Sequence, residues 1–329
     1  MATLWIQFLV SAFLIIVAGT GLTRNAEAIS RHTGLGALWA GVFLLPLATS
    51  LPELVTSWRS AIIGAPDLAV GNVFGSNMFN IFIIAMIDLS HGNSPLLTRV
   101  SQRHIFTATF SMLVTAFVAV NILMPSSFRL GWLGLDTVAI LAFYLLGNWL
   151  LSRFERRHAV QASALEGSSA VRPLGQALFF FILAALVIVV AGTILADTGE
   201  AIARETGMGQ TLFGSFFIAV TTSLPEVVTT FTAVRLGVLD MAIGNIFGAN
   251  FFNLLILFFA DLFYRPGPIM QVISGSHLVT ALMSIILTCL AVIGLIYRSQ
   301  RCFVRLGYDS MAIVFGYFIA LLLLFLAAF

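Results

Sequence analysis

Two short segments decide the fold because the chain carries each of them twice: Ala48-Thr49-Ser50-Leu51-Pro52-Glu53 and Gly71-Asn72-Val73-Phe74-Gly75-Ser76-Asn77-Met78-Phe79-Asn80. They return 173 positions later as Thr221-Thr222-Ser223-Leu224-Pro225-Glu226 and Gly244-Asn245-Ile246-Phe247-Gly248-Ala249-Asn250-Phe251-Phe252-Asn253. The same register, without a gap, pairs Glu27 with Glu200, Asp67 with Asp240, Asp88 with Asp261, His104 with His277 and Asp136 with Asp309. The chain is therefore an internal duplication in which each copy places one glutamate inside an apolar segment.

The composition indicates a protein that lies in lipid. Hydrophobic residues make up 60% and charged residues only 9% of the 329 residues, whereas about a quarter of an ordinary soluble chain is charged. A net charge of +2 is too small to indicate a nucleic-acid partner. Cys289 and Cys302 form neither a disulfide framework nor a metal-ligand pattern. The amino terminus lacks a basic region before its first apolar run, so we expect that run to be a retained helix.

A bilayer core requires about 20 apolar residues per helix. Ten segments are long enough, at 4–22, 35–62, 68–88, 105–125, 132–152, 175–195, 208–235, 241–262, 278–297 and 310–328. Five spans per half is an odd number, so the second half must enter the membrane in the opposite sense. We predict an all-α integral membrane protein with ten transmembrane helices in two inverted-topology five-helix repeats, at 1–152 and 175–329. A short cytoplasmic linker, 153–174, joins them and is too short for a regulatory domain.

The arginines predict the orientation. Twelve of the sixteen basic residues fall in the connections that follow odd-numbered spans, and the other four are Arg59, Arg129, Arg204 and Arg265. Cytoplasmic loops carry the excess of positive charge. We therefore expect a multi-pass protein of the plasma (inner) membrane with both termini outside the cytoplasm.

Glu53 and Glu226 are the residues most in need of an explanation. A carboxylate in hydrocarbon is costly unless it is paired, protonated or turned to a polar cavity. Arg59 lies six residues after Glu53 but on another helix face, and Thr232 takes its place after Glu226. No arginine partner is common to both copies, which favours a cation or a proton as the partner. Two glutamates that only hydrogen-bond between packed helices are the alternative.

Pro52 and Pro225 are expected to free backbone carbonyl groups beside each glutamate. A proline inside a helix cannot donate to the carbonyl four residues earlier, and unpaired backbone at this depth is tolerated where it lines a cavity. Two carboxylates with several neutral carbonyls form the oxygen cage that Ca²⁺ prefers. The hydroxyl groups of the residues before each proline would suit Na⁺; these residues are Thr49, Ser50, Thr222 and Ser223.

The second segment of each copy adds glycines and asparagines. The glycines predict a close approach of two helices, while packing alone explains the buried asparagines poorly. His104 and His277 are interpreted as anchors at the membrane surface, and Asp67 and Asp240 as helix caps. The four remaining aspartates of the spans are expected at span ends that water reaches: Asp88, Asp136, Asp261 and Asp309.

These segments resemble the paired alpha-repeats of the sodium/calcium exchanger family, within the cation/Ca²⁺ antiporter superfamily. The family signature is G-T-S-x-P-E followed by G-N-x-x-G-S-N-x-x-N, and both copies match it in order and spacing. The resemblance covers nearly the whole chain and implies a ten-helix inverted fold without the large Ca²⁺-sensing region of animal exchangers.

The resemblance also implies roles for individual residues. Glu53 and Glu226 would be shared Ca²⁺ and Na⁺ ligands, completed by the carbonyl groups of Thr49 and Thr222. Na⁺ would be bound by the hydroxyl groups of Ser50, Ser76 and Ser223 and by the carbonyl of Ala219, with Asn80 and Asn253 flanking the centre. The chain departs from the family where Asn253 replaces a frequent acid, Ala249 replaces serine, Ala48 replaces glycine, and Pro46 replaces the small residue that matches Ala219.

Secondary antiport of Ca²⁺ against Na⁺ by alternating access is the function that this pattern predicts. H⁺-coupled exchange of Ca²⁺ or another divalent cation on the same fold is the alternative, because Asn253 is neutral. A cation channel is a remote alternative, since one chain supplies both halves of one site. A scaffold or receptor is disfavoured by the short loops. No enzymatic constellation is present, and no cofactor is predicted.

Overall fold

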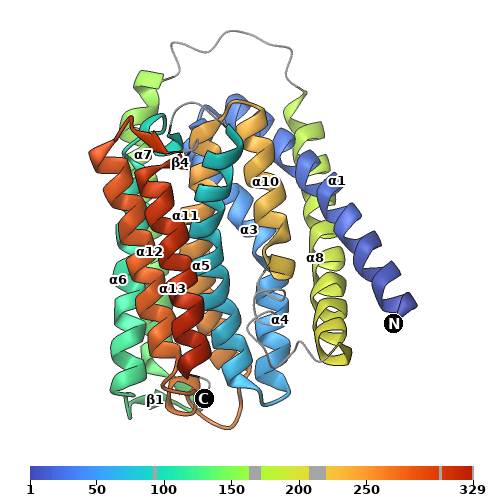
Figure 1. Ribbon diagram of the computed structural model, residues 1–329, viewed down its shortest axis with the longest axis vertical. Coiled ribbons are helices and arrows are strands. Elements are labelled where there is room, and N and C mark those ends of the chain that lie inside the picture. Colours follow the sequence, from blue (N-terminus) through green and yellow to red (C-terminus); the bar gives the residue numbers. More distant parts are fainter. Residues whose placement is uncertain (92–94, 163–171, 207–219, 304–305, 328–329) are drawn as a thin grey trace.

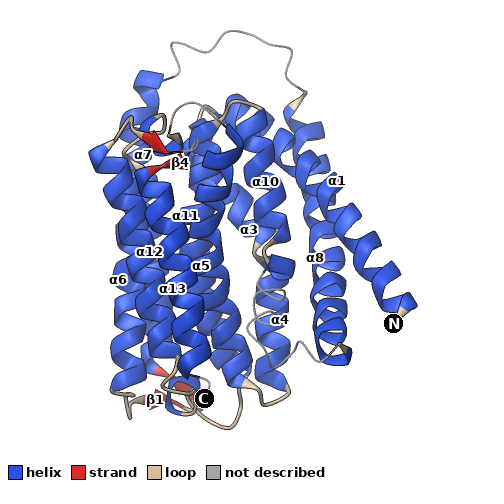
Figure 2. Ribbon diagram, viewed as in Figure 1, coloured by secondary structure: helices blue, strands red, loops and turns tan. Residues whose placement is uncertain are grey.

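Long helices make up most of the structure, as Figure 2 shows. The computed structural model describes residues 1–91, 95–162, 172–206, 220–303 and 306–327. Its α-helices are α1 (Ala2–Thr33), α2 (Gly36–Trp39), α3 (Leu45–Thr49), α4 (Leu51–Ile62), α5 (Pro66–His91), α6 (His104–Leu123), α7 (Leu135–Ala162), α8 (Leu174–Glu205), α10 (Leu224–Arg235), α11 (Leu239–Phe263), α12 (His277–Tyr297) and α13 (Tyr308–Ala327). The shorter elements are the π-helical turn η1 (Ala40–Leu44), the 3₁₀ turns η2 (Leu96–Thr98) and η4 (Ile269–Gln271), and the strands β1 (Arg129–Leu130), β2 (Leu133–Gly134), β3 (Cys302–Phe303) and β4 (Leu306–Gly307).

The described helices agree with a ten-span membrane fold. Within the ranges above, eight helices are long and apolar enough to cross a bilayer, and the bent pair 36–49 with 51–62 makes a ninth. The first part of the predicted span 208–235 lies outside the described residues, and its remainder contains α10. The start of α1 and the end of α13 lie toward the same end of the bundle (Figure 1), as an even number of crossings requires.

Three helices run beyond their predicted spans. α1 and α8 each have 32 residues, and α7 continues into the predicted linker as far as Ala162. The added turns of α1 and α8 are held by ion pairs one helical turn apart, Arg31 with Glu27 at 2.7 Å and Arg204 with Glu200 at 2.6 Å. Apolar length predicts the membrane crossing, but charged turns that follow it can remain helical in water.

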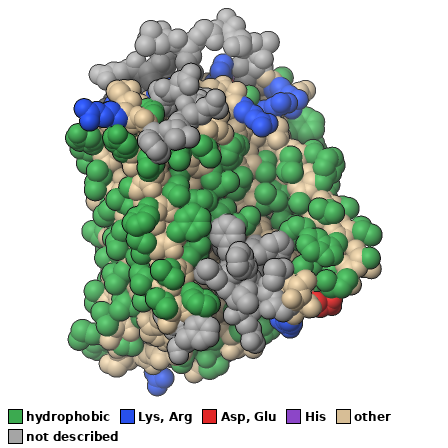
Figure 3. Space-filling view, viewed as in Figure 1, with side chains coloured by type: hydrophobic (Ala, Val, Ile, Leu, Met, Phe, Trp, Pro, Cys, Tyr) green, Lys and Arg blue, Asp and Glu red, His purple; other side chains and the backbone are tan. Residues whose placement is uncertain are grey.

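The helices form two groups. α1 and α8 pack along each other, and they contact the remaining helices mainly through α10 and α4. Figure 1 shows this pair at the right, beside the larger group that contains α5, α6, α7, α11, α12 and α13. On the face seen in Figure 3, hydrophobic side chains cover the middle of the molecule and arginines gather mostly at its upper rim. This distribution is typical of a lipid-facing belt.

Two glycines let α11 approach the broken helix of the first repeat, as the sequence predicts. A Cβ atom on Gly248 would lie 2.4 Å from the Val42 carbonyl oxygen and 2.7 Å from Pro46 Cγ. A Cβ atom on Gly244 would lie 3.1 Å from the backbone of Gly41. The backbone of η1 therefore lies directly against α11, next to the Ser50 break described below.

The prediction that water reaches the aspartates at span ends is wrong for Asp88, Asp261 and Asp136, which are buried. Asp261 accepts hydrogen bonds from the Ile269 N–H at 2.6 Å and the Gly134 N–H at 2.8 Å. Asp88 accepts from Leu96 at 2.7 Å and Gly307 at 2.8 Å. These acids hold loop backbone at opposite ends of the bundle, in positions that the repeat relates.

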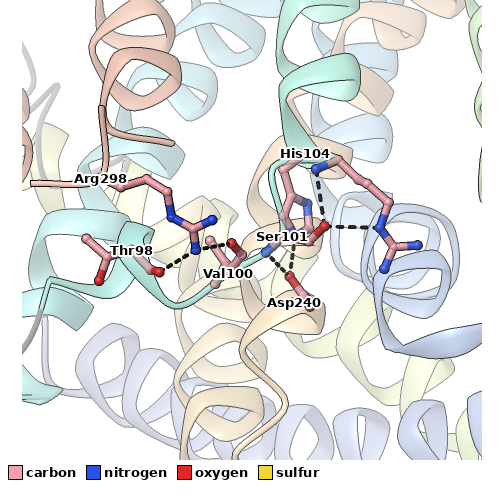
Figure 4. A network of polar contacts seen from close by, with 7 residues as sticks. Thr98, Val100, Ser101, His104, Asp240 and Arg298 are labelled. Carbon is pink, nitrogen blue, oxygen red and sulfur yellow. Dashed lines mark hydrogen bonds and ion pairs between the residues drawn. The ribbon is translucent and has the colours of Figure 1, made fainter. Parts of the chain in front are cut away.

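His104 and His277 contact Asp240 and Asp67, respectively, across the two repeats. Asp67 and Asp240 lie within the first turns of α5 and α11 rather than before them, so the cap prediction for these two aspartates is wrong. Asp240 accepts from the Ser101 N–H at 2.7 Å and lies 3.0 Å from His104 Nε2 (Figure 4). Asp67 contacts Ser274 and His277 in the same way, at 2.7 and 3.0 Å. Each repeat thus binds the loop that precedes a helix of the other repeat.

Candidate functional site

Both glutamates lie where a helix begins inside the molecule. Ser50 separates α3 from α4 with φ −89° and ψ 6°, and Ser223 precedes α10 with φ −88° and ψ 12°. Pro52 and Pro225 are therefore in the first turn of new helices, where a proline costs no hydrogen bond. The prediction of a proline inside a continuous helix is corrected accordingly: the chain breaks just before each proline, and a 42° bend follows in the first repeat.

These breaks orient two helix amino termini toward the two carboxyl groups. Glu53 and Glu226 are first-turn residues of α4 and α10. The unpaired N–H groups of a first helical turn carry partial positive charge, which favours a nearby carboxylate. The sequence places the acid directly after the proline in both copies, so the local fold itself creates this environment.

The two glutamates are buried and close to each other. Each side chain is 1% exposed, and the carboxyl groups lie close enough to interact electrostatically. The Ser50 hydroxyl donates to Glu226 Oε1 at 3.1 Å, which joins the helix break of the first repeat to the acid of the second. Both Glu53 carboxyl oxygens and Glu226 Oε2 lack a hydrogen-bond partner among the described residues.

The residues before each glutamate lie at the breaks. Thr49 is the last residue of α3, and its side chain lies beside Glu226 with that of Ser50. Thr222 and Ser223 are buried at the equivalent positions, and the Ser223 hydroxyl has no partner in the described part of the chain. Ala219, a predicted carbonyl ligand, lies outside the described residues.

Four asparagines form a reciprocal network where α5 crosses α11. Asn77 Nδ2 donates to the Asn250 carbonyl at 3.3 Å, and Asn250 Nδ2 donates to the Asn77 carbonyl at 3.0 Å. Asn80 Nδ2 donates to Asn250 Oδ1, and Asn253 Nδ2 to Asn77 Oδ1, each at 3.0 Å. The side-chain amides of Asn80 and Asn253 thus donate to this network through Nδ2. Their Oδ1 atoms remain available as acceptors, since they are buried and have no partner in the described ranges.

Ser76 breaks the symmetry of this crossing. Its hydroxyl is buried and unpartnered among the described residues. The equivalent residue of the second repeat is Ala249, which is fully buried and has only a methyl group. The two halves therefore supply similar backbone and amide oxygens but unequal hydroxyl oxygens.

The arrangement is suited to binding small cations. Buried polar atoms are normally hydrogen-bonded, so a group of buried oxygens without partners indicates a missing ligand, ion or water. Such oxygens occur on Glu53, Glu226, Ser76, Ser223, Asn80 and Asn253. Carboxylate, amide and hydroxyl oxygens are the hard ligands that Ca²⁺ takes. No cluster of three acidic, histidine or cysteine side chains occurs in the part of the chain that the structure describes.

Two functional features were missed by reasoning from the sequence. The contact of Ser50 with Glu226 and the central position of Asn77 and Asn250 both join the repeats. The sequence contained a signal for the central asparagines, because Asn77 and Asn250 occupy equivalent positions in the two copies. The contact of Ser50 with Glu226 depends on how the two repeats pack, which a local sequence pattern does not predict.

Comparisons with known proteins give relatives of the chain and structures of the same fold. Among curated proteins, the chain is 28% identical to the inner membrane protein YrbG of Escherichia coli, over 86% of each chain. It is 28% identical to the putative antiporter CaxA of Alkalimonas amylolytica, over 81% of this chain and 82% of that one. The solved structure of the sodium-calcium exchanger NCX_Mj superposes with a TM-score of 0.71 at 22% identity, over 97% of this chain and 98% of that one.

The family assignment rests on both halves of the chain. The description of the matching family is "sodium/calcium exchanger protein", and the match covers residues 3–152 and 176–329, one block for each repeat. The fold of NCX_Mj agrees with ten helices in two repeats. The protein is a membrane antiporter of the sodium/calcium exchanger family.

Proposed function

We propose that the chain exchanges Ca²⁺ against Na⁺ at a single central site whose shared ligands are Glu53 and Glu226. The observation that carries this proposal is the pair of 1% exposed carboxyl groups, one from each repeat, with oxygens that no described group satisfies. The carbonyl groups of Thr49 and Thr222 would complete the Ca²⁺ shell. Ser50, Ser76, Ser223 and Ala219 would serve Na⁺, with Asn80 and Asn253 beside the centre.

Exchange follows from competition for the same ligands. Ca²⁺ or Na⁺ can neutralise the two carboxylates, but both cannot occupy the same oxygens. An empty site would leave two bare carboxylates in surroundings of low dielectric, which opposes reorientation without cargo. The loaded states therefore move more readily than the empty one, and uptake of one ion is coupled to release of the other.

Alternating access would come from movement of α1 and α8 past the site. Gly19 of α1 faces Val228, and Gly192 of α8 faces Pro52, so small residues meet the helices that hold the glutamates. The apolar stretches 4–22 and 174–195 contain no charged residue. The Thr23 hydroxyl makes a 3.3 Å hydrogen bond to Thr229. The Arg59–Asp197 ion pair between α4 and α8 is about half exposed, and such pairs contribute little, so this surface opposes sliding only weakly.

Proton coupling is a second candidate, and one observation favours it. Asn253 and Ala249 remove an acid and a hydroxyl that the family pattern provides, while carboxylates can bind protons without further ligands. The two candidates share the site and differ only in the ion that displaces Ca²⁺. Both orientations of the chain in the membrane are compatible with exchange; the arginines favour termini outside the cytoplasm.

Flux in reconstituted vesicles tests the proposal. We expect Ca²⁺ uptake into vesicles preloaded with Na⁺, and its loss by at least about 100-fold in Glu53→Gln and Glu226→Gln, because an amide removes the charge that binds the cation. Glu27→Gln is the matched control, since Glu27 pairs with Arg31 at the edge of α1. Replacing the Na⁺ gradient by a pH gradient distinguishes the coupling ions. Retention of full flux in both glutamate variants would contradict the site assignment.

A further inference from the structure

The charge of the central site can be counted from the residues that build it. Glu53 and Glu226 are its carboxylates, and the buried crossing of α5 and α11, which the proposed function places beside them, carries amides at Asn80 and Asn253. The segment 207–219, which the structure does not describe, contains no charged residue in its sequence. The pair therefore carries about −2 when both glutamates are ionised, and the contacts of the described residues bring no further carboxylate to it.

Other charged groups of the molecule are engaged elsewhere. Arg59 forms an ion pair with Asp197 of α8 at 2.7 Å, and the two side chains are 56% and 50% exposed. Asp88 and Asp261 bind loop backbone at the two ends of the bundle. Asp67 and Asp240 bind the loops before α12 and α6. None of these carboxylates contributes to the pair at the helix breaks.

The amides cannot take over the role of an acid. The Nδ2 atoms of Asn80 and Asn253 are fixed by 3.0 Å hydrogen bonds to Asn250 Oδ1 and Asn77 Oδ1. Their free Oδ1 atoms can bind a cation as neutral ligands but add no negative charge. In addition, Ser76 provides a hydroxyl on one side of the crossing only, because Ala249 provides none on the other.

We infer that the exchange is electroneutral, with one Ca²⁺ moving against two monovalent cations in each cycle. This inference rests on the proposed function and holds for both Na⁺ and H⁺ as the coupling ion. One Ca²⁺ or two monovalent ions bring the site to zero net charge. A third monovalent ion would leave an uncompensated positive charge in a buried site, which is unfavourable. It would also lack one hydroxyl ligand, because Ala249 stands where the first repeat has Ser76.

The dependence of Ca²⁺ accumulation on membrane potential tests this inference. The full-length protein is reconstituted in vesicles with a fixed Na⁺ or pH gradient, and K⁺ with valinomycin sets the potential. We expect the steady-state Ca²⁺ ratio to stay unchanged between zero and 100 mV. Exchange of three monovalent ions per Ca²⁺ would change that ratio by about 50-fold per 100 mV, with inside-positive potential favouring uptake. A shift of that size would overturn the inference and leave the proposed function intact.

Failure of the proposed function has a different signature. Absence of Ca²⁺ flux under every gradient would reject antiport itself and the inference with it. A binding measurement in detergent then gives an independent result without transport. We expect the logarithm of the apparent Ca²⁺ affinity to fall with a slope close to −2 against the logarithm of the Na⁺ concentration if Na⁺ is the coupling ion. If H⁺ is the coupling ion, we expect it to rise with a slope close to +2 against pH. A magnitude near 3 would contradict the charge count.

A single substitution should convert the stoichiometry. Asn253→Asp places a third carboxylate beside the pair, so we expect potential-dependent accumulation and a displacement slope of magnitude near 3. Asn121→Asp is the matched control, because Asn121 lies on α6 with its amide bonded to Phe117 of the same helix. That control should keep electroneutral exchange. Unchanged slopes in Asn253→Asp would show that position 253 does not set the charge of the site.

Discussion

Individual amide groups decide the geometry at the centre of this exchanger. An asparagine can present either its donor or its acceptor to a neighbour. The reciprocal bonds between Asn77 and Asn250 fix the orientation of both side-chain amides. The Oδ1 atoms of these two residues then accept hydrogen bonds from Asn80 and Asn253 and orient them. Because the repeats supply identical residues at these positions, one network serves both halves and leaves two buried amide oxygens without a partner among the described residues.

Asn77→Ala and Asn250→Ala should each destabilise the protein by about 1–3 kcal/mol, because each leaves buried polar groups without partners. Both side chains belong to one hydrogen-bond network, so the loss in the double variant should differ from the sum of the single losses by about 0.5 kcal/mol or more. Thermal unfolding in detergent measures all three variants. Strictly additive losses would contradict the reciprocal network.

At the scale of elements, the broken helices and their close packing make the site. Ser50 separates α3 from α4 and Ser223 directly precedes α10, so each glutamate lies in the first turn of a helix that begins inside the molecule. The η1 turn and α3 keep their position because Gly244 and Gly248 of α11 leave room for their backbone. A change in that contact would move Pro46 and, with it, the break at Ser50.

Gly248→Ala should therefore destabilise the protein by about 1–3 kcal/mol, since the added methyl group meets the Val42 carbonyl and the Pro46 ring and the backbone must shift. Gly175→Ala on α8 is the matched control, because a Cβ atom there meets nothing within 4 Å. That control should be neutral or stabilising by up to about 1 kcal/mol, because alanine favours a helix over glycine. Equal unfolding temperatures of the two variants would contradict the packing account.

The whole molecule is two oppositely inserted repeats bound together at both ends and at the centre. Figure 1 shows the start of α1 toward one end and β4 at the other. β4 pairs with β3, which contains Cys302, one of two cysteines and the exposed one. A native thiol thus reports on the end of the bundle that the arginines predict to be cytoplasmic.

We expect a membrane-impermeant maleimide to label Cys302 only after intact cells are opened, in a Cys289→Ala background. An added cysteine at Ala2 should be labelled in intact cells. Slight desolvation and the nearby Asp88 and Asp309 carboxylates raise the pKa of the exposed Cys302 thiol. Only the thiolate reacts, so labelling should accelerate as the pH rises through and above the ordinary cysteine pKa of about 8.5. Labelling of Cys302 in intact cells would contradict the orientation.

The sequence was sufficient for the fold because hydropathy and duplication are both periodic properties of the chain. The odd number of spans per repeat predicts inversion, and the paired segments predict which residues meet. Pro52 and Pro225 were interpreted as lying inside helices rather than in the first turn of new ones, because a proline is compatible with a kink as well as with a helix start. The burial of Asp88 and Asp261 could not be predicted, since each binds one N–H group of a loop distant in the sequence, that of Gly307 or Gly134.

The position of a bound divalent cation tests the central claim most directly. Crystals of the full chain soaked in Ca²⁺ or Sr²⁺ and measured by anomalous diffraction would give that position. The account predicts one principal peak between Glu53 and Glu226, within about 2.3–2.6 Å of oxygens from both carboxyl groups for Ca²⁺, and its loss in Glu226→Gln. A principal peak that contacts neither carboxyl group, or one that persists in that variant, would contradict it.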